Sequence, residues 1–310
     1  MTLRVLKAGL STTVQDLGRY GYAHLGISPC GAADAVSFRI ANRLVGNEEY
    51  APALEMTLLG ATMEFERNAM VAISGASCDC KVGQYRIPIN TTVGVPAGAV
   101  LQCGNMTGGA RAYLAVRGGV DVPLVMGSAS TDLRGGFGGI EGRRLRAGDV
   151  IQVGKATWSS PRRLRKQAID GLWRSGPIRI TRGAQREWFS NDEYAKFLAT
   201  SFSLSEQSDR AGLRLKGGPI HPLDQKQLLT DGIPLGAVQV PQDGQPIILF
   251  VDQQTTGGYP KIANVIAADM HRVGQLRPRD QVRFAEVSMA EAVEALRAQE
   301  RWLKGIWQES

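Results

Sequence analysis

The chain has 310 residues, enough for one large domain or two medium ones, and its 43% hydrophobic and 21% charged content is typical of soluble globular proteins. It has no apolar run of about 18 residues and no apolar signal-peptide core at its start, which excludes a membrane-spanning helix and leads us to expect a cytoplasmic protein. The formal charge of +7 comes without a helix-turn-helix, RNP-like or zinc-finger pattern, so we expect no nucleic-acid or membrane partner.

The first half of the chain is predicted to consist of short strands separated by Gly, Pro and Asn turns. A single helix is expected over residues 34–45, because apolar residues recur on one face, Asp34 can act as N-cap and Gly46 follows the end. The predicted strands are Leu3–Leu6, Thr62–Phe65, Met70–Ile73, Tyr85–Ile89, Val100–Cys103, Ala112–Val116 and Val150–Val153. This spacing favours β-barrels or sandwiches over a parallel α/β sheet.

A basic stretch separates this half from a second half rich in strands. We predict an N-terminal β-barrel lobe over 1–154, a basic linker over 155–177, a C-terminal β-barrel lobe over 178–287 and a C-terminal helix over 288–310. Ser190 with Glu193, and Ser288 with Glu291, have the spacing of capping boxes at helix starts.

Two polar, glycine-rich loops follow predicted strands and form the candidate site. The first, over 127–143, carries Ser128, Ser130, Thr131, Asp132 and Arg134. Such loops bring backbone N–H groups and short hydroxyls close to a ligand. Asp16 and Arg19, in a similar segment upstream, are expected to join this loop.

The second loop follows the predicted strand Ile247–Val251 and begins at Asp252. We predict that Asp252 is the acid/base group because a rigid strand would hold it in place, that Asp16 helps to activate water, and that Arg210 binds an anion. The other substrate-binding residues expected in this loop are Thr255, Thr256, Gly257, Gly258 and Tyr259. Both loops are predicted to line one cleft, although Gly and Pro also serve as ordinary turn residues and the Asp–Arg pairs as inter-strand ties.

Familiar catalytic motifs are absent from the sequence. It contains no G-x-x-x-x-G-K-[ST] phosphate loop, no G-x-S-x-G elbow and no dinucleotide fingerprint in a strand-to-helix setting. The three histidines, at positions 24, 221 and 271, are widely spaced, so we expect no metal site.

Several of these same segments carry a resemblance to a known family. They include Gly9-Leu-Ser-Thr-Thr-Val-Gln-Asp-Leu-Gly-Arg-Tyr-Gly, Tyr113-Leu-Ala-Val-Arg-Gly-Gly-Val-Asp, Gly127-Ser-Ala-Ser-Thr-Asp, Gln239-Val-Pro-Gln-Asp-Gly-Gln-Pro-Ile and Gln254-Thr-Thr-Gly-Gly-Tyr-Pro-Lys-Ile-Ala. The sequence resembles, from end to end, the biotin-dependent carboxyltransferase-like family, which includes the allophanate hydrolase subunit 2 proteins. Within that family it is most similar to the group formed by the C subunits of bacterial 5-oxoprolinases.

The resemblance implies a mainly β protein with two cyclophilin-like β-barrel lobes and a few short helices. It also implies a hetero-complex with partners similar to the A and B subunits of 5-oxoprolinase, which cleaves 5-oxo-L-proline to L-glutamate at the expense of ATP. Because the chain has no phosphate loop, either ATP is bound at a shared or unusual site or a partner binds it, and we expect the chain alone to be inactive. Two alternatives are a carboxyltransferase component of a urea-carboxylase-like biotin system and a non-enzymatic regulator that binds a kinase-inhibitor homologue.

Overall fold

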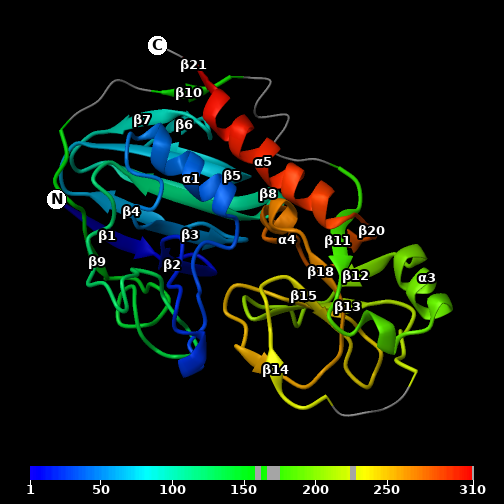
Figure 1. Ribbon diagram of the computed structural model, residues 1–310. Helices are drawn as coiled ribbons and strands as arrows, with labels where there is room; N and C mark the ends of the chain where they lie inside the picture. Colours follow the sequence, from blue (N-terminus) through cyan, green and yellow to red (C-terminus); the bar gives the residue numbers. More distant parts are fainter. Residues whose placement is uncertain (158–161, 166–174, 224–227, 309–310) are drawn as a thin grey trace. The chain divides into compact units, whose positions relative to one another are not determined.

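Two β-sheets of nine and eight strands dominate the computed structural model, which describes residues 1–157, 162–165, 175–223 and 228–308 (Figure 1). The chain divides into two units. The first comprises Met1–Arg19, Cys30–Trp173 and Leu303–Ser310, and the second comprises Tyr20–Pro29 and Arg174–Trp302. Residues 158–161 and 166–174 of the predicted basic linker lie outside the described part of the chain.

The sheet of the first unit is antiparallel, with the order β2-β3-β8-β4-β1-β9, and β5 pairs with β8, β7 and β6. Its strands are β1 Thr2–Lys7, β2 Ser11–Gln15, β3 Ala53–Thr57, β4 Thr62–Phe65, β5 Ala69–Val82, β6 Tyr85–Ile87, β7 Thr92–Val95, β8 Val100–Val116 and β9 Val150–Gln152. A separate short pair joins β10 Arg163–Leu164 to β21 Trp307–Gln308.

Strands β5 and β8 are much longer than the sequence predicts, with 14 and 17 residues. The predicted strands ended at Ile73 in the first case and covered only 100–103 and 112–116 in the second, because glycine is common where strands end. In the structure these strands continue through irregular pairing, with register shifts between Gly75 and Ser77 and between Cys78 and Cys80. Gly75 has φ 109°, so this glycine marks a bulge within a strand and not its end.

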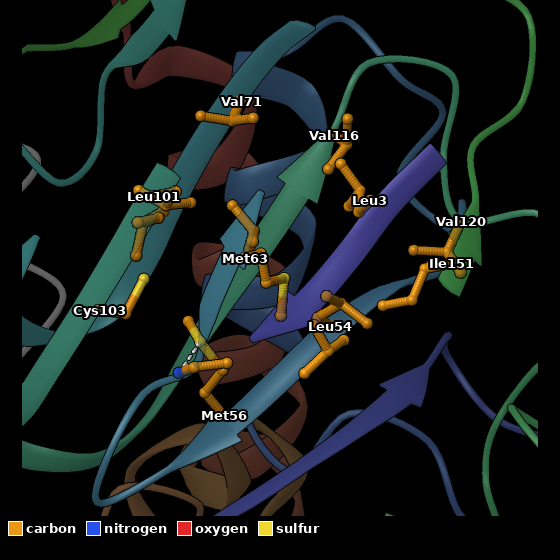
Figure 2. Packing of buried hydrophobic residues seen from close by; sticks show 14 of the residues in the cluster. Leu3, Leu54, Met56, Met63, Val71, Leu101, Cys103, Val116, Val120 and Ile151 are labelled. Atoms are coloured by element: carbon orange, nitrogen blue, oxygen red, sulfur yellow. Dashed lines mark hydrogen bonds between the residues drawn. The ribbon is translucent and has the colours of Figure 1, made fainter. Parts of the chain in front are cut away.

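The core of the first unit lies where these strands turn their apolar side chains toward one another (Figure 2). Leu3, Leu54 and Leu101 come from three different strands and are fully buried. Helix α1 (Ala35–Leu44) packs against β5 and β8 and buries Phe38 and Ile40. Its cap is as predicted: the Asp34 side chain accepts a hydrogen bond from Ser37 N.

The second unit holds an eight-stranded sheet in the order β19-β12-β13-β16-β15-β18-β11-β20, in which only the β11–β20 pair is parallel. Its strands are β11 Ile178–Arg182, β12 Phe202–Leu204, β13 Gly212–Lys216, β15 Ala237–Gln239, β16 Ile247–Leu249, β18 Lys261–Val265, β19 Gln281–Val282 and β20 Phe284–Glu286. A separate ribbon pairs β14 Asp231–Gly232 with β17 Thr256–Gly257. The described helices of this part are η1 Ala23–Leu25, η2 Arg186–Trp188, α3 Asn191–Ala199, η3 Ala267–Asp269, α4 Met270–Val273 and α5 Met289–Gly305, whose last residues belong to the first unit.

The predicted fold class is confirmed: the protein is mainly β, with one half-barrel sheet and one nearly closed barrel sheet. The helices differ in two details from the predictions. The C-terminal helix α5 ends at Gly305, before the predicted end at residue 310, and strand β21 follows it. Helix α5 has the full predicted capping box, since Ser288 and Glu291 exchange hydrogen bonds, whereas at α3 Ser190 caps Glu193 N but the Glu193 carboxylate accepts from His221 N.

Candidate functional site

Asp16 is the centre of a buried polar cluster in the first unit. It directly follows β2, and the residue is 8% exposed. Oδ1 accepts hydrogen bonds from Ser128 Oγ at 2.7 Å, Ser130 Oγ at 2.6 Å and Gly18 N at 2.7 Å, and Oδ2 accepts from Ala129 N at 2.6 Å. Four neutral donors therefore hold this carboxylate, so its orientation is set by the two loops that supply them.

The first glycine-rich loop is fastened to strand β2 through both main chain and side chains. Thr131 donates to Val14 O from its backbone N at 3.0 Å and from Oγ1 at 2.9 Å, and Asp16 N donates to Ser130 Oγ at 3.0 Å. Because β2 lies in the sheet, these bonds give the loop a fixed position. Asp16, Ser128, Ser130 and Thr131 are thus brought together.

Asp132 and Arg134 occupy the outer part of the same loop. The Asp132 carboxylate closes a turn by accepting from Arg134 N at 3.0 Å and from Gly135 N at 2.7 Å. Arg134 itself is exposed. Asp132 therefore shapes the loop, while the Arg134 side chain extends into solvent.

Arg19 is buried against this loop and is 2% exposed. Its Nη2 donates to Ser130 O, its Nε to Val125 O at 3.5 Å, and its Cζ lies 4.9 Å from the centre of the Phe137 ring. Its Nη1 is buried and has no hydrogen-bond partner among the described residues. The guanidinium thus stands beside the Asp16 cluster.

In the second unit, Asp252 and Arg210 form a buried bidentate ion pair. Arg210 Nε donates to Oδ2 at 2.8 Å and Nη2 to Oδ1 at 3.0 Å, while Asp252 N donates to Arg210 O at 2.9 Å. The Asp252 side chain is 2% exposed and the Arg210 side chain is 10% exposed. The pair therefore joins the segment before β13 to the segment after β16, and both carboxylate oxygens of the predicted acid/base group already accept hydrogen bonds.

The second glycine-rich loop is partly a strand. Thr256 and Gly257 form β17 and pair with β14, and Ile233 N donates to Thr255 O at 3.0 Å. Gly258 is exposed, and Tyr259 is 46% exposed. The loop thus presents its polar groups at the edge of a small ribbon.

Two buried polar residues, one in this loop and one just after it, were not among the predicted site residues. Lys261 is 3% exposed, and its Nζ donates to Asp231 Oδ2 at 2.7 Å. Gln253 is also 3% exposed; its Nε2 donates to Ile233 O at 2.9 Å, and its Oε1 has no hydrogen-bond partner within the described structure. The one signal available was position, since Lys261 opens an apolar strand-like run where a buried side chain is expected.

The predicted site residues therefore form two groups, one in each unit. Asp16, Arg19 and the 128–134 loop share the first unit, while Arg210, Asp252 and the 255–259 loop share the second. That both groups line one cleft stays a prediction.

Among the described residues, no group of three or more His, Cys, Asp or Glu side chains is positioned to hold a metal ion. The same residues contain no helix long and apolar enough to cross a membrane. The chemistry available in both groups is thus that of carboxylates, guanidinium groups, hydroxyls and backbone N–H groups.

Comparison with known proteins assigns the chain to a family. A model of the carboxyltransferase domain, subdomain A and B, matches residues 25–286. The chain belongs to this carboxyltransferase domain family. The C subunit of the 5-oxoprolinase of Escherichia coli (strain K12) is 42% identical over 304 residues, which are 98% of this chain and 97% of that protein.

Members of the carboxyltransferase domain family also occur inside much longer chains. Urea amidolyase of Saccharomyces cerevisiae is 33% identical over 92% of this chain but only 17% of its own length. The crystal structure of the Kluyveromyces lactis urea amidolyase matches 97% of this chain and 20% of that chain, with a TM-score of 0.89 and 32% identity. The domain is therefore found both as a chain of this length, named as one component of an enzyme, and as a fraction of a larger polypeptide.

Proposed function

We propose that the chain is one component of an ATP-dependent 5-oxoprolinase, which cleaves 5-oxo-L-proline to L-glutamate together with partners similar to the A and B subunits of that enzyme. The observation that carries the proposal is the 42% identity to the 5-oxoprolinase C subunit, because the similarity extends over 98% of this chain and 97% of that protein. The match to urea amidolyase covers only 17% of that protein and supports the proposal less.

The chemistry explains why ATP is needed. The five-membered lactam is an unstrained amide, so its carbonyl carbon reacts slowly with water. Transfer of the γ-phosphoryl group of ATP to the amide oxygen makes that carbon electrophilic. Water then adds to the carbon, the carbon–nitrogen bond breaks and the nitrogen takes a proton, which leaves an acyl phosphate. A second water hydrolyses this acyl phosphate and releases L-glutamate and phosphate. We assign ATP binding to the assembled complex and not to this chain by itself, since this chain has no phosphate loop.

Within this reaction we propose that Asp16 and Asp252 handle protons or water. The geometry favours Asp16: its four donors are neutral, and among the described residues no cation forms an ion pair with this carboxylate. Asp252 would have to open its ion pair with Arg210 before it accepts a proton. Asp16→Asn should therefore lower the turnover of the assembled complex by a larger factor than Asp252→Asn, when each is measured per folded molecule.

The deciding experiment is reconstitution. The purified chain is mixed with candidate proteins similar to the A and B subunits, and 5-oxoproline-dependent loss of ATP is followed together with formation of glutamate. Mixtures that lack one protein serve as controls. The proposal fails if all three proteins are folded and no 5-oxoproline-dependent ATP hydrolysis occurs.

A second candidate is a carboxyltransferase component of a urea-carboxylase-like system, which the structural match to the Kluyveromyces lactis urea amidolyase favours. This function requires a biotinylated partner and a biotin carboxylase. Urea-dependent ATP hydrolysis in a mixture with those proteins, without any response to 5-oxoproline, would select it.

A further inference from the structure

Among the arginines that the structure describes, Arg19 is unusual because it is a buried cation with neutral partners only. Three arginines are buried in the described structure, namely Arg19, Arg111 and Arg210. Arg111 lies 3.6 Å from the carboxylate of Glu55, and Arg210 is paired with Asp252. Arg19, within the same set of residues, forms no ion pair.

The partners of Arg19 leave its charge poorly compensated. Nη2 donates to Ser130 O and Nε donates to Val125 O. The face of the guanidinium contacts the Phe137 ring, and Nη1 has no hydrogen-bond partner within the described residues. A buried charge is costly unless it is paired and hydrogen-bonded, and an unsatisfied buried donor adds to that cost. An anion at Nη1 would satisfy both requirements at once.

Nearby negative charge limits which anion is suitable. Ser130 contacts both groups, since its hydroxyl donates to Asp16 Oδ1 at 2.6 Å and its carbonyl accepts from Arg19. The Asp132 carboxylate lies on the same loop, and Asp132 N donates to Phe137 O at 2.9 Å. Two carboxylates in the neighbourhood repel a phosphate dianion more strongly than a carboxylate, which carries one charge.

The loop around Arg19 is closely fitted to the guanidinium. A Cβ atom placed on Gly138 would overlap Ser130 O and lie 2.9 Å from Arg19 Nη2, so glycine is needed for the loop to pass this close. Phe137, which covers the guanidinium, is flanked on each side by two glycines.

We propose that Arg19 is the binding residue for the carboxylate group of a small organic acid, with Nη1 as the donor. The inference rests on the proposed function for the identity of that acid: the carboxylate of 5-oxo-L-proline would be the group bound. Arg19, and not the already paired Arg210, then binds the substrate anion, and Asp16 stands beside it across Ser130.

Three ring compounds separate the parts of this proposal. 5-Oxo-L-proline has the lactam and the carboxylate, 2-pyrrolidinone has only the lactam, and tetrahydro-2-furoate has a ring carboxylate without a lactam. Binding of each is measured by isothermal titration calorimetry, both to the isolated chain and to the complex with its partner proteins. We expect the two carboxylates to bind and 2-pyrrolidinone to bind at least tenfold more weakly, as expected when about one charged hydrogen bond is lost.

Variants then locate the binding group. Arg19→Gln should weaken carboxylate binding by about tenfold or more, Arg19→Lys by less because it keeps the charge, and the exposed Arg144→Gln should leave it unchanged. Carboxylates that bind equally well to Arg19→Gln would overturn the proposal. If the Arg19 variants do not fold, the wild-type protein still decides, because equal binding of 2-pyrrolidinone and 5-oxo-L-proline, or no binding of either carboxylate, also overturns it.

Two outcomes separate this inference from binding of a partner protein by Arg19 and from the proposed function. If no carboxylate binds but Arg19→Gln weakens association with a partner protein, the anion belongs to that partner and the inference fails. If the reconstituted complex has no 5-oxoproline-dependent activity while tetrahydro-2-furoate binds through Arg19, the proposed function fails and the carboxylate site stands.

Discussion

Residue by residue, burial decides which charged groups of this protein matter for stability. Asp252→Asn would leave Arg210 buried without its bidentate partner, so we expect a loss of about 3–5 kcal/mol in the free energy of unfolding. The matched control is Glu206→Gln, which breaks the exposed pair with Arg279 and should cost about 1 kcal/mol or less. Urea unfolding of both variants measures the difference, and equal losses would show that the Arg210 pair contributes no more than an exposed one.

Asp269 leads to a prediction about acid stability. Burial would raise the pKa of this carboxyl, but hydrogen bonds from Arg179 and the charges of Arg179 and Arg272 together hold it below its ordinary value of 3.8. A carboxyl whose pKa is lower in the folded than in the unfolded state stabilises the protein fully at pH values above the unfolded pKa. This stabilisation is lost as the pH falls through the folded pKa.

We expect the melting temperature to depend less steeply on pH in Asp269→Asn than in the wild type. The melting temperature of the wild type should fall as the pH drops below about 4, whereas Asp269→Asn should start lower at pH 7 and lose less over the same interval. Melting curves between neutral pH and pH 3 test this. Parallel curves for the two proteins would contradict the assigned role of Asp269.

At the scale of elements, the glycines of the first polar loop are not equivalent. Gly136 and Gly138 have nearly the same backbone angle, φ 70° and 72°. A Cβ atom on Gly138 would overlap Ser130 O, whereas one on Gly136 meets no atom within 4 Å. Both alanine variants carry the cost of a left-handed backbone, about 1 kcal/mol, but Gly138→Ala must also displace the loop from Ser130 and Arg19.

We therefore expect Gly138→Ala to unfold at a clearly lower urea concentration than Gly136→Ala and to lose affinity for carboxylates as well. The comparison cancels the shared backbone cost, so the remaining difference reports how closely the loop approaches Ser130. Identical stabilities would mean that the loop can shift freely, and that its fit around Arg19 is not needed.

For the whole molecule, the prediction concerns assembly. The chain has no phosphate loop, and its relatives are either named as one component of an enzyme or contain this domain within a longer polypeptide. We expect the 33.4 kDa chain to form a hetero-complex with a protein similar to the B subunit of 5-oxoprolinase and to turn over no substrate alone. Light scattering after gel filtration gives the mass of the mixture. Full activity of the isolated chain would remove the partner requirement.

Much of the fold followed from local sequence patterns, because capping and alternation act between residues close together in the chain. Asp34 and Ser288 cap their helices as predicted, and β4 has the predicted bounds. The long strands were underestimated because a glycine looks the same in a bulge and in a turn until its partner strand is known. The polar loops could be predicted from their composition, but the contacts within them could not.

Local sequence patterns were enough to predict that this protein is mainly β, which loops are polar and glycine-rich, and which family it resembles. The residues that each polar side chain contacts became known from the folded structure alone. Asp16 meets Ser130 across 114 residues, and Arg210 meets Asp252 across 42. Among the described residues, Arg210 therefore has a carboxylate partner, whereas Arg19 has none and its Nη1 has no hydrogen-bond partner. Both arginines stand in polar, Gly-containing segments with an aspartate nearby in sequence, and local pattern cannot separate them. Burial and pairing are set by which strands the sheet places side by side, and that choice depends on the whole chain.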